Sequence, residues 1–599
     1  MKRFILTLLN IAAAWSLCAG EIYVSPSGDD RNNGSCGHPL QTLHQALRQA
    51  REWRRTGDPR TEGGIRIVLG EGTYPMNRPL FVRPEDSGTA ESPTVISSAE
   101  GAEVSLSGGI AIGGWKRDGA LWVADAPAVQ GRPMIFRQLW NGGRRCLRAR
   151  QFADGFMERM IDFDPVRRTI TIPAPIVDGI SDPHQLEMIV HQRWAIAILR
   201  VKDIRIDGAR AEVSFLEPES ELEFTHPWPQ PVIGGEFGNS SFVLVNAPEF
   251  VDSEGEWWQD YSTGRIYYKP FADDRIENFV LTAPLTERLV TVAGTGLRPV
   301  EHIAFENIRF EHAAWNRPTE HGHVTLQGGF PLADAYKLQQ EGLPWNSALE
   351  NQAWIERPDA AVSVTDAAHI RFDGCTFTHL GATGLDFAAS VRDSSISNCT
   401  FDDIGGTAIL VGSFAEGPHE AHIPFLQTAD ERLFCERIEI RDNTVRNATV
   451  EDWGAVGIGA GYVRDTEISG NEVSHVNYSG ICVGWGWTAH ENGMRNNRIT
   501  GNYVHDFALQ LYDAGGIYTL SNQPDSEISD NTIENLGEAP YATNDRGFYI
   551  YLDEATDGYT IRDNRCPEQR FGTNKPGPAV RWLHNGPAVR PKNRFSYKP

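Results

Sequence analysis

Apolar and polar positions repeat at a long, regular interval through the C-terminal half of the chain. Eight segments share the order apolar, two polar or small residues, Asn or Cys, one further residue, apolar: "IAFENIRF", "IRFDGCTF", "SSISNCTF", "IEIRDNTV", "TEISGNEV", "RITGNYV", "SEISDNTI" and "YTIRDNRC". Aligning them forms one column at Ile308, Cys375, Cys399, Asn443, Asn471, Asn502, Asn531 and Asn564. Where no large insertion intervenes, the column positions are 24, 28, 31, 29 and 33 residues apart. Such steps are too long for a hairpin meander and are typical of solenoid coils.

Each of these coils has an apolar edge that it cannot bury alone. Stacked coils bury that edge by forming parallel sheets around a continuous interior. The pattern, which has Gly-rich turns and no helical periodicity, therefore predicts an all-β fold, a right-handed parallel β-helix. Asn tolerates left-handed backbone and forms amide hydrogen bonds between stacked coils, so we interpret the recurrent asparagines as scaffold. Cys375 and Cys399 occupy the same column and are interpreted as buried core thiols.

The N-terminal half departs from this period and divides into three parts. Residues 1–20 combine two basic residues, an apolar run and small residues, which predicts a secretory signal peptide cleaved near Gly20. Residues 21–114 are expected to form an N-terminal cap and the first coils. Residues 115–288 lose the period and are expected to form an inserted, sandwich-like antiparallel β-domain. Residues 289–599 then form the main β-helix.

Local signals support this division. The cap is predicted from a helix that would close the open end of the solenoid, with Leu43, Ala46, Leu47, Ala50 and Arg54 at helical spacing. The inserted domain is predicted from two hairpins, one turning at Asn141-Gly142-Gly143 and the other around Ser262, Thr263 and Gly264.

Two long excursions, at about 313 to 358 and 413 to 436, interrupt the coils and are expected to wall a binding face. The first contains Trp345. The second contains Glu416, His419, Glu420 and His422. We interpret this second set as a polar loop, because no recognisable zinc signature is present.

Composition narrows the range of partners. The net charge is -24, and loss of Lys2 and Arg3 with the signal peptide would make it about -26, which opposes nucleic acid as a partner. No second apolar run is long enough to insert into a membrane. The eight cysteines include no CxxC and are not spaced as a disulfide framework. We therefore expect a monomer without cofactor or metal, secreted or periplasmic.

Two carboxylates stand beside short aromatic strands in "ALQLYDAGGIYTL", residues 508 to 520, and "GFYIYLDEATDGYTI", residues 547 to 561. Strict alternation would turn Phe548, Ile550 and Leu552 inward and Tyr549, Tyr551 and Asp553 outward. Neighbouring coils would add Trp485, Trp487 and Tyr518 to the outer face. Aromatic rings suit the C–H faces of sugars, so these residues are predicted to line a groove, although the tryptophans could instead pack in the core.

If Ile517 pairs with Ile550, Asp513 enters its strand while Asp553 leaves the next one. Two carboxylates across an aromatic groove are the minimum equipment for glycosidic hydrolysis, one as acid and the other as base or nucleophile. Their diagonal offset favours the wider separation of about 6.5–9.5 Å that accompanies inversion. Each aspartate could instead cap a turn, and Glu554 is the alternate catalytic residue if a turn presents it. The roles of acid and base stay open.

Supporting residues are suggested by position alone. His475 and His505 lie near turns leading into the groove strands, where each could bond a sugar hydroxyl or the backbone. Trp315 and His312 follow a strand before the first excursion and could close one end of a pocket. Asp452 is a further candidate of the same kind.

The chain resembles glycoside hydrolase family 141 through "IYVSPSGDDRNNG", "FRQLWNGGRRCLRARQF", "GEWWQDYSTGRIYY", "HIAFENIRFEHAAW", "GICVGWGW", "YDAGGIYTLS" and "FYIYLDEATDGYTIRDN". The similarity covers essentially the whole mature chain. It implies an exported parallel β-helix enzyme with α-L-fucosidase or xylanase activity, in several cases from gut bacteria that digest pectin. It also implies two catalytic aspartates, which fall on Asp513 and Asp553. Some of these motifs are shared with a β-helix xylosidase family.

Three classes of function follow. The first is a glycosidase that removes a terminal sugar, with α-L-fucose as the expected sugar, from plant cell-wall pectic polysaccharide; a xylanase or β-xylosidase on the same fold is its alternative. The second is a polysaccharide lyase, which needs a basic proton abstractor and often calcium. The candidate strands contain no Lys or Arg, although Arg546 is close. The third is a non-catalytic glycan-binding solenoid.

Overall fold

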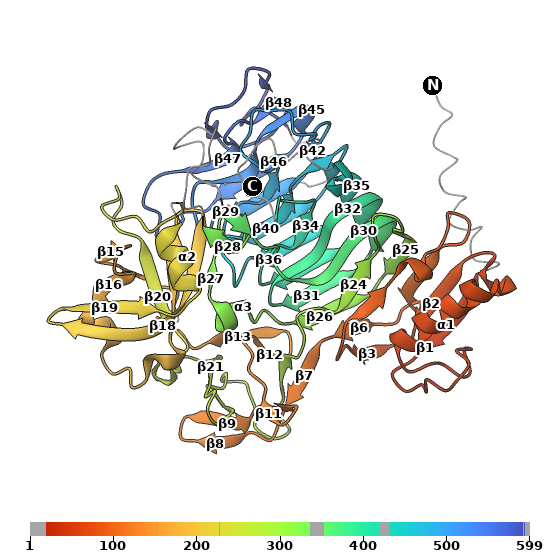
Figure 1. The fold of residues 1–599 in the computed structure, drawn as a ribbon, viewed down its shortest axis with the longest axis horizontal. Helices are drawn as coiled ribbons and strands as arrows, with labels where there is room; N and C mark the ends of the chain where they lie inside the picture. Colours follow the sequence, from red (N-terminus) through yellow and green to blue (C-terminus); the bar gives the residue numbers. More distant parts are fainter. Residues whose placement is uncertain are drawn as a thin grey trace.

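The computed structural model describes residues 19–152, 154–226, 228–335, 353–417, 431–590 and 592. Most of the expected signal peptide, together with Trp345, His419, Glu420 and His422, lies outside the described residues. Figure 1 shows one long stack of coils, running from the red N-terminal end through green to the blue C-terminal end, with yellow and orange sheets beside it.

A helix closes the N-terminal end of the stack, as the apolar spacing predicts. It is α1 (Leu43–Thr56), capped by the side chain of Thr42, which accepts from the backbone N–H of Gln45, and ended by Gly57 at φ 63°. Its buried face carries Leu43, Ala46, Leu47, Ala50 and Trp53. Trp53 takes the place expected for Arg54, whose guanidinium instead bonds Ser92 and Thr94.

Parallel strands form three faces of the β-helix. One face contains β24 (Val290–Ala293), β30 (Ala360–Asp373), β32 (Thr383–Ser397), β34 (Ile409–Val411), β37 (Ile458–Ala460), β41 (Ile481–Val483), β44 (Ala514–Thr519), β47 (Gly547–Leu552) and β49 (Phe571–Thr573). We call it the pocket face. The second face continues from β25 (Val300–Glu306) through β35 (Cys435–Arg441), β39 (Glu467–Ser469), β42 (Arg498–Thr500), β45 (Asn522–Ser529), β48 (Asp557–Arg562) and β50 (Arg581–Leu583).

The third face is a separate sheet of nine parallel strands. They are β3 (Gly72–Pro75), β6 (Val104–Ser107), β26 (Arg309–Ala313), β31 (Thr376–Leu380), β33 (Thr400–Ile404), β36 (Thr444–Ala448), β40 (Glu472–Val476), β43 (Tyr503–Phe507) and β46 (Thr532–Leu536). The first coils are completed by β1 (Gly20–Val24), β2 (Ile65–Leu69), β4 (Leu80–Val82) and β5 (Thr94–Ser98). The fold class expected from the period is confirmed.

Like residues stack on like inside the coils. Phenylalanine rings lie nearly parallel at 4.9 Å between Phe305 and Phe372 and at 4.5 Å between Phe377 and Phe401. Cys375 and Cys399 are 1 % exposed. All seven cysteines in the described part of the chain have free thiols, in agreement with the expectation of no disulfide framework. Ring overlap from coil to coil adds to the free energy gained by burying the aromatic surface.

A buried asparagine ladder fixes the height of each coil. The Oδ1 atom of Asn471 accepts from the backbone N–H of Asn443 at 3.0 Å and from its Nδ2 at 2.9 Å. The same pair of bonds recurs from Asn471 to Asn502, from Asn502 to Asn531, from Asn531 to Asn564 and from Asn564 to Asn585. The predicted amide stacking is therefore confirmed.

The backbone explanation for these asparagines is wrong. Positive φ falls on the residue before the ladder position: Asp442 at 58°, Gly470 at 64°, Gly501 at 65°, Asp530 at 57° and Asp563 at 57°. The ladder asparagines themselves do not have positive φ. The turn is thus made by one residue, whereas the next residue supplies the amide that joins neighbouring coils.

Two eight-stranded sheets are formed mainly by the segment that separates the first coils from the main helix in the sequence, and they lie beside the stack (Figure 1). One has the order β7 (Gly109–Ile112), β23 (Leu281–Pro284), β12 (Leu139–Asn141), β13 (Arg144–Arg148), β21 (Glu256–Gln259), β22 (Arg265–Tyr268), β9 (Leu121–Asp125), β8 (Lys116–Asp118). Both predicted hairpins are present: β12 pairs antiparallel with β13, and β21 pairs antiparallel with β22.

The second sheet approaches the pocket face. Its order is β14 (Glu158–Arg159), β20 (Ser241–Val245), β17 (Glu187–Gln192), β18 (Ala195–Asp207), β19 (Arg210–Phe215), β16 (Thr169–Pro173), β15 (Asp162–Asp164). The short strand β27 (His323–Val324), from the first excursion, pairs with β18. This pairing ties the inserted domain to the main helix. None of the helices in the described ranges has the length and apolar content needed to cross a bilayer.

Candidate active site

One cavity on the pocket face collects both predicted aspartates. It has a volume of about 230 Å³ and is lined by Trp194, Trp228, Gln327, Tyr478, Trp487, Asp513, Arg546, Tyr551, Asp553, Glu554, Asn574 and Lys575. The register that the sequence suggested is confirmed, because Ile517 pairs with Ile550 and Tyr518 with Tyr551. The cavity thus spans neighbouring coils near the C-terminal end of the stack.

Asp513 lies immediately before β44 and is 8 % exposed. Its Oδ1 accepts from the hydroxyl of Tyr551 at 3.1 Å, and its Oδ2 lies 3.4 Å from a terminal nitrogen of Arg546. Burial raises the pKa of Asp513, whereas the charges of Arg546 and Arg193 and the Tyr551 hydrogen bond oppose the rise. These groups all favour the ionised form of the Asp513 carboxyl, whereas burial disfavours it.

Asp553 follows the last residue of β47 and has a different environment. Its Oδ2 accepts from the hydroxyl of Tyr518, and its Oδ1 accepts from Nδ2 of Asn574 at 2.8 Å. Burial, followed by the negative charge of Asp513, raises the pKa of Asp553 to about 6. The two carboxyl groups therefore interact, and the charge of Asp513 disfavours ionisation of Asp553.

Strict alternation fails at the start of β47. Ile550 and Leu552 are fully buried inside the coils as expected, and Tyr551 faces outward among the aromatic residues of the pocket wall. Tyr549, however, packs inside the coils, with its ring centroid 6.4 Å from that of Phe507. Phe548 packs outside the coils, with its ring centroid 4.8 Å from that of Tyr551. The prediction that Tyr549 lines the groove is therefore wrong, because the side chains of residues 549 and 550 both enter the core.

Glu554 also lines the cavity, because β47 ends at Leu552 and a turn follows, with Ala555 at φ 62°. The turn that could present Glu554 to the groove is present. Its Oε1 lies 2.6 Å from Nζ of Lys575. This ion pair engages the Glu554 carboxylate at the rim, whereas the hydrogen-bond partners of Asp553 are neutral.

Two indole rings of the cavity wall come from the inserted domain. Trp194 lies in the tight turn between β17 and β18, next to Arg193, and its ring centroid lies 5.3 Å from that of Trp228. The guanidinium of Arg193 lies over the Trp228 ring at 4.2 Å. Trp194 is fixed by its indole N–H, which donates to the carbonyl of Leu326 at 2.9 Å. The pocket thus has an indole wall that the β-helix does not supply.

The two predicted tryptophans of "SGICVGWGW" separate. Trp487 lines the cavity, whereas Trp485 packs behind it against Phe330 at 5.3 Å and Phe414 at 5.0 Å. Tyr518 is 3 % exposed and stands behind Asp553 as its hydrogen-bond donor. Trp485 thus follows the alternative of packing in the core, whereas Tyr518, which was predicted to line the groove, is covered by its contact with Gln327 of the first excursion.

His475 and His505 do not reach the pocket, contrary to expectation. They lie on β40 and β43 of the nine-stranded sheet, with ring centroids 6.3 Å apart. His475 is exposed, and His505 bonds Asp506 at 2.6 Å and stacks on Tyr503 at 4.3 Å. Turns leading into a groove strand also lead out of the preceding sheet, which explains the misplacement.

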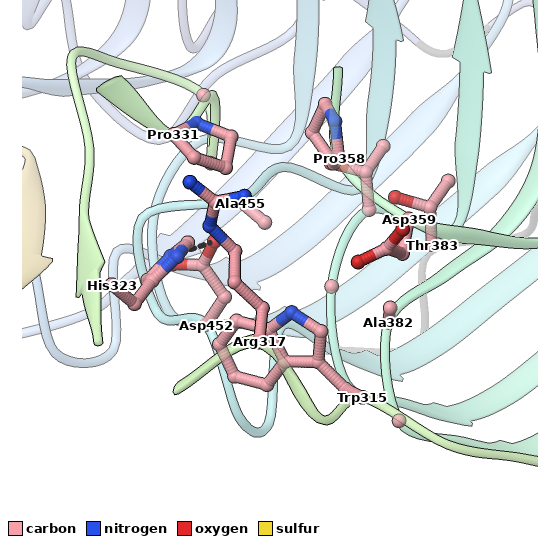
Figure 2. A pocket seen from close by; sticks show the side chains of 15 residues that line it. Trp315, Arg317, His323, Pro331, Pro358, Asp359, Ala382, Thr383, Asp452 and Ala455 are labelled. Carbon is pink, nitrogen blue, oxygen red and sulfur yellow. Dashed lines mark hydrogen bonds and ion pairs between the residues drawn. The ribbon is translucent and has the colours of Figure 1, made fainter. Parts of the chain in front are cut away.

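His312 and Trp315 also lie away from the two aspartates. His312 is buried, with Nδ1 3.0 Å from Oγ of Ser107, and burial lowers its pKa to about 4. Trp315 borders a second pocket, in which His323 and Asp452 point toward one another at 3.0 Å (Figure 2). This second pocket, of about 20 Å³, has room for roughly one water molecule. It is too small for a sugar ring.

Backbone strain gathers around the larger cavity. Arg193, Trp487 and Asp513 have φ values of 50°, 48° and 59°, a region that side chains other than glycine rarely adopt. Such conformations persist where the surrounding structure imposes them and are often found at functional sites. Trp487 and Asp513 line the cavity, and the charge of Arg193 lowers the pKa of Asp513.

Sequence reasoning missed Trp194, Trp228, Gln327, Tyr478, Asn574 and Lys575. The first three come from segments outside the repeat, so no period could place them beside the coils. Asn574 follows β49 one coil after Asp553, and the continuing repeat is the one signal that could have suggested it. Arg546, which the sequence placed near the groove, does line it.

Comparison with known proteins agrees with this architecture. Residues 119–271 match the model of the GH141 insertion domain, and residues 436–573 match that of the right handed beta helix region. A solved structure described as "Glycoside hydrolase" is 43 % identical, with a TM-score of 0.93 over 96 % of this chain and 97 % of that one. No curated protein sequence matches the chain.

Two more distant solved structures match the chain at low similarity. A complex of XylC with xylose is 11 % identical, with a TM-score of 0.45 over 92 % of this chain and 69 % of that one. A GH136 lacto-N-biosidase from Eubacterium ramulus is 10 % identical, with a TM-score of 0.37 over 95 % of this chain and 67 % of that one.

The fold, the inserted domain and the similarity over nearly the full length define a glycoside hydrolase built on a right-handed parallel β-helix. The chain belongs to glycoside hydrolase family 141. As a glycoside hydrolase it acts on a carbohydrate substrate.

Proposed function

We propose that the enzyme removes a terminal sugar, α-L-fucose, from pectic polysaccharide with Asp553 as general acid and Asp513 as general base. The observation that carries this assignment is the shared cavity in which burial and the charge of Asp513 raise the pKa of Asp553 to about 6. A glycosidase needs one protonated and one ionised carboxyl group, and environments that push two pKa values apart assign the roles.

In this mechanism the protonated Asp553 donates its proton to the glycosidic oxygen as the bond from the anomeric carbon to that oxygen breaks. Asp513 takes a proton from the water molecule whose oxygen bonds to the same carbon. Tyr551 and Arg546 stabilise the negative charge on Asp513 before the reaction. Asp513 becomes neutral and Asp553 ionised, and exchange with solvent restores both groups.

The form of the cavity supports removal of a single terminal sugar. Its volume of about 230 Å³ lies below the roughly 300–1,000 Å³ common for drug-sized ligands. Trp194 and Trp228 form part of the wall of this small cavity. The choice of α-L-fucose rests on the resemblance to a family with fucosidase activity. Export to the periplasm or medium, cleavage near Gly20 and a monomeric state belong to the same proposal.

The test is hydrolysis of a panel of aryl glycosides and pectic oligosaccharides, with NMR identifying the anomer first released. Release of L-fucose is expected, with loss of at least about 10³-fold in kcat for Asp513→Asn and Asp553→Asn, as is usual for essential catalytic groups. Glu554→Gln is the matched control in the same cavity and is expected to keep most of the activity. Wild-type rates in both aspartate variants would overturn the assignment.

The same panel separates the other reactions. Retention of configuration would make Asp513 the nucleophile, and release of xylose would replace the sugar. A lyase would form an unsaturated product that absorbs in the ultraviolet. Arg546 and Lys575 line the pocket, but each pairs with a carboxylate, at 3.4 Å to Asp513 and 2.6 Å to Glu554. These pairs oppose the neutral base that a lyase requires.

A further inference from the structure

A tight turn of the first excursion, residues 326–330, reaches into the active cavity. The backbone N–H of Leu326 donates to the carbonyl of Phe330 at 2.9 Å, and that of Phe330 donates to the carbonyl of Gln327 at 3.1 Å. Gly328 and Gly329 have φ values of 62° and 78°, which glycine adopts at no steric cost. The turn presents Gln327, 7 % exposed, to the cavity.

The turn is anchored on both sides. Trp194 donates to the carbonyl of Leu326 at 2.9 Å, and Phe330 packs against Phe414 at 4.3 Å. Gly329 lies so close to Asp452 that an added Cβ would be 2.8 Å from its Oδ2. Asp452 is itself held by His323 at 3.0 Å, the contact drawn in Figure 2. The small second pocket is therefore packing that supports this turn.

Gln327 joins a chain of hydrogen bonds that ends on Asp553. Its Nε2 donates to the hydroxyl oxygen of Tyr518 at 2.8 Å, and the Tyr518 hydroxyl donates to Oδ2 of Asp553. A phenol has a single hydrogen, and an amide nitrogen can only donate. Because Gln327 occupies a lone pair of the Tyr518 oxygen, the hydrogen of Tyr518 points at Asp553.

We infer that Gln327 is a positioning residue for the general acid. By holding Tyr518 as a donor, it prevents Asp553 from placing its own proton on the Tyr518 oxygen and leaves that proton on the side of the carboxyl group that faces the cavity. Gln327 is 191 positions from Tyr518 in the sequence and belongs to an excursion rather than to a coil. The inference rests on the proposed role of Asp553 as acid.

The test is a double-mutant cycle with Gln327→Met and Tyr518→Phe. Gln327→Met is expected to lower kcat about tenfold with KM within about twofold, the signature of an interaction used in the transition state. The alkaline limb of the pH–rate profile moves to higher pH, because the Tyr518 hydrogen bond that lowers the pKa of Asp553 is weakened. In the Tyr518→Phe background, Gln327→Met is expected to have no further effect.

Two further variants sharpen the result. Gln327→Glu replaces the donor with an acceptor that turns the Tyr518 hydroxyl away from Asp553, so its loss of kcat should exceed that of Gln327→Met. Gln523→Met makes the same chemical change at a buried glutamine that bonds Tyr559 and Asn497 outside the cavity. It is expected to lower the melting temperature without moving the alkaline limb.

The inference would be overturned if Gln327→Met lowered kcat by the same factor in the wild type and in Tyr518→Phe, and left the alkaline limb of the pH–rate profile unmoved. The pH dependence of the melting temperature reports the titration of Asp553 without substrate. In wild type the melting temperature should fall as the pH rises and Asp553 ionises. In Gln327→Met this fall should continue to a higher pH. If no fucoside is hydrolysed but this shift is seen, the proposed sugar fails and the positioning role stands; if fucosides are hydrolysed without the shift, the positioning role fails.

Discussion

Tyr518 and Tyr551 are register partners on neighbouring strands, and their hydroxyl groups donate to different carboxylates. Their ring centroids lie 5.4 Å apart with planes at 84°. Tyr551, on β47, donates to Asp513, which immediately precedes β44. Tyr518, on β44, donates to Asp553, which immediately follows β47. Each carboxylate is thus bonded from the adjacent coil, and one tyrosine can be altered without removing the donor of the other aspartate.

Tyr551→Phe is expected to act on the base. Loss of its hydrogen bond removes a contribution that lowers the pKa of Asp513, so that pKa rises further. In the proposed mechanism Asp513 must be ionised to accept a proton, and the acid limb of the pH–rate profile therefore moves to higher pH. We expect kcat/KM to fall about tenfold on the acid side and less near neutrality, from the loss of one hydrogen bond to a charged group. Tyr549→Phe is the control, because Tyr549 lies two residues before Tyr551 on β47 but packs inside the core. It should leave the pH–rate profile unchanged.

The wild-type enzyme is expected to lose activity as the pH rises through about 6, because Asp553 must carry a proton to act as the acid. Burial and the charge of Asp513 set that pKa, so Asp513→Asn should lower it as well as remove the base. Infrared or NMR signals of the Asp553 carboxyl group, followed as a function of pH, would measure its pKa in the wild type and in Asp513→Asn. An Asp553 pKa below that of Asp513 would reverse the two roles.

Stability should change with pH in the opposite sense to that of an ion-paired carboxylate. The pKa of Asp553 is raised from 3.8 to about 6, so the folded state binds more protons than the unfolded state between these values. The contribution of this group is most favourable below about pH 4 and is lost as the pH rises through about 6, a change of about 3 kcal/mol.

Asp553→Asn removes the cost of burying this charge and should therefore raise the free energy of unfolding at pH 8 by about 1–3 kcal/mol, with little effect at pH 4. Thermal melts at the two pH values check this. A variant that is less stable than the wild type at pH 8 would contradict the assigned burial of the charge.

Trp228→Ala is expected to weaken binding more than chemistry. The indole forms a wall of the cavity and is covered by the guanidinium of Arg193 at 4.2 Å. Loss of the ring should raise KM about 10-fold to 100-fold, from the roughly 1–3 kcal/mol available from burying one aromatic face. Trp258→Ala is the control, because Trp258 lies in the same inserted domain but packs against Tyr267, with ring centroids 5.6 Å apart and planes tilted by 31°. Equal effects on KM from both variants would indicate general damage to the domain.

Asn502→Ala should destabilise the β-helix without touching the cavity. Its Oδ1 accepts twice from Asn471, and its Nδ2 donates to Ile468 and Asn531 at 2.9 and 3.0 Å. Alanine leaves these buried groups without partners, which should cost about 2–4 kcal/mol. Chemical denaturation measures the loss, and activity at low temperature should be retained. A loss below about 0.5 kcal/mol would show that the ladder contributes little.

The period of the repeat was sufficient to predict the β-helix, the asparagine ladder and the register of Ile517 with Ile550. These features depend on residues that recur at fixed places and therefore leave a pattern. It also brought Asp513 and Asp553 to the same cavity, because two positions on stacked strands must lie close together.

The walls of the cavity left no such pattern. Trp194, Trp228 and Gln327 come from single, non-repeated turns, and their approach to the coils depends on packing between distant segments. The placement of Tyr549 failed for another reason. A local irregularity sends two consecutive side chains into the core, and alternation has no means of signalling it.

The cavity draws on segments from early, middle and late in the chain: Trp194 and Trp228 from the inserted domain, Gln327 from the turn, and Asn574 and Lys575 just after β49. A growing chain therefore lacks part of the site until synthesis has passed residue 575. Exchange of the inserted domain between relatives would replace the indole wall while leaving the two aspartates and their tyrosines in place. Changes in sugar preference could then arise in evolution without rebuilding the catalyst.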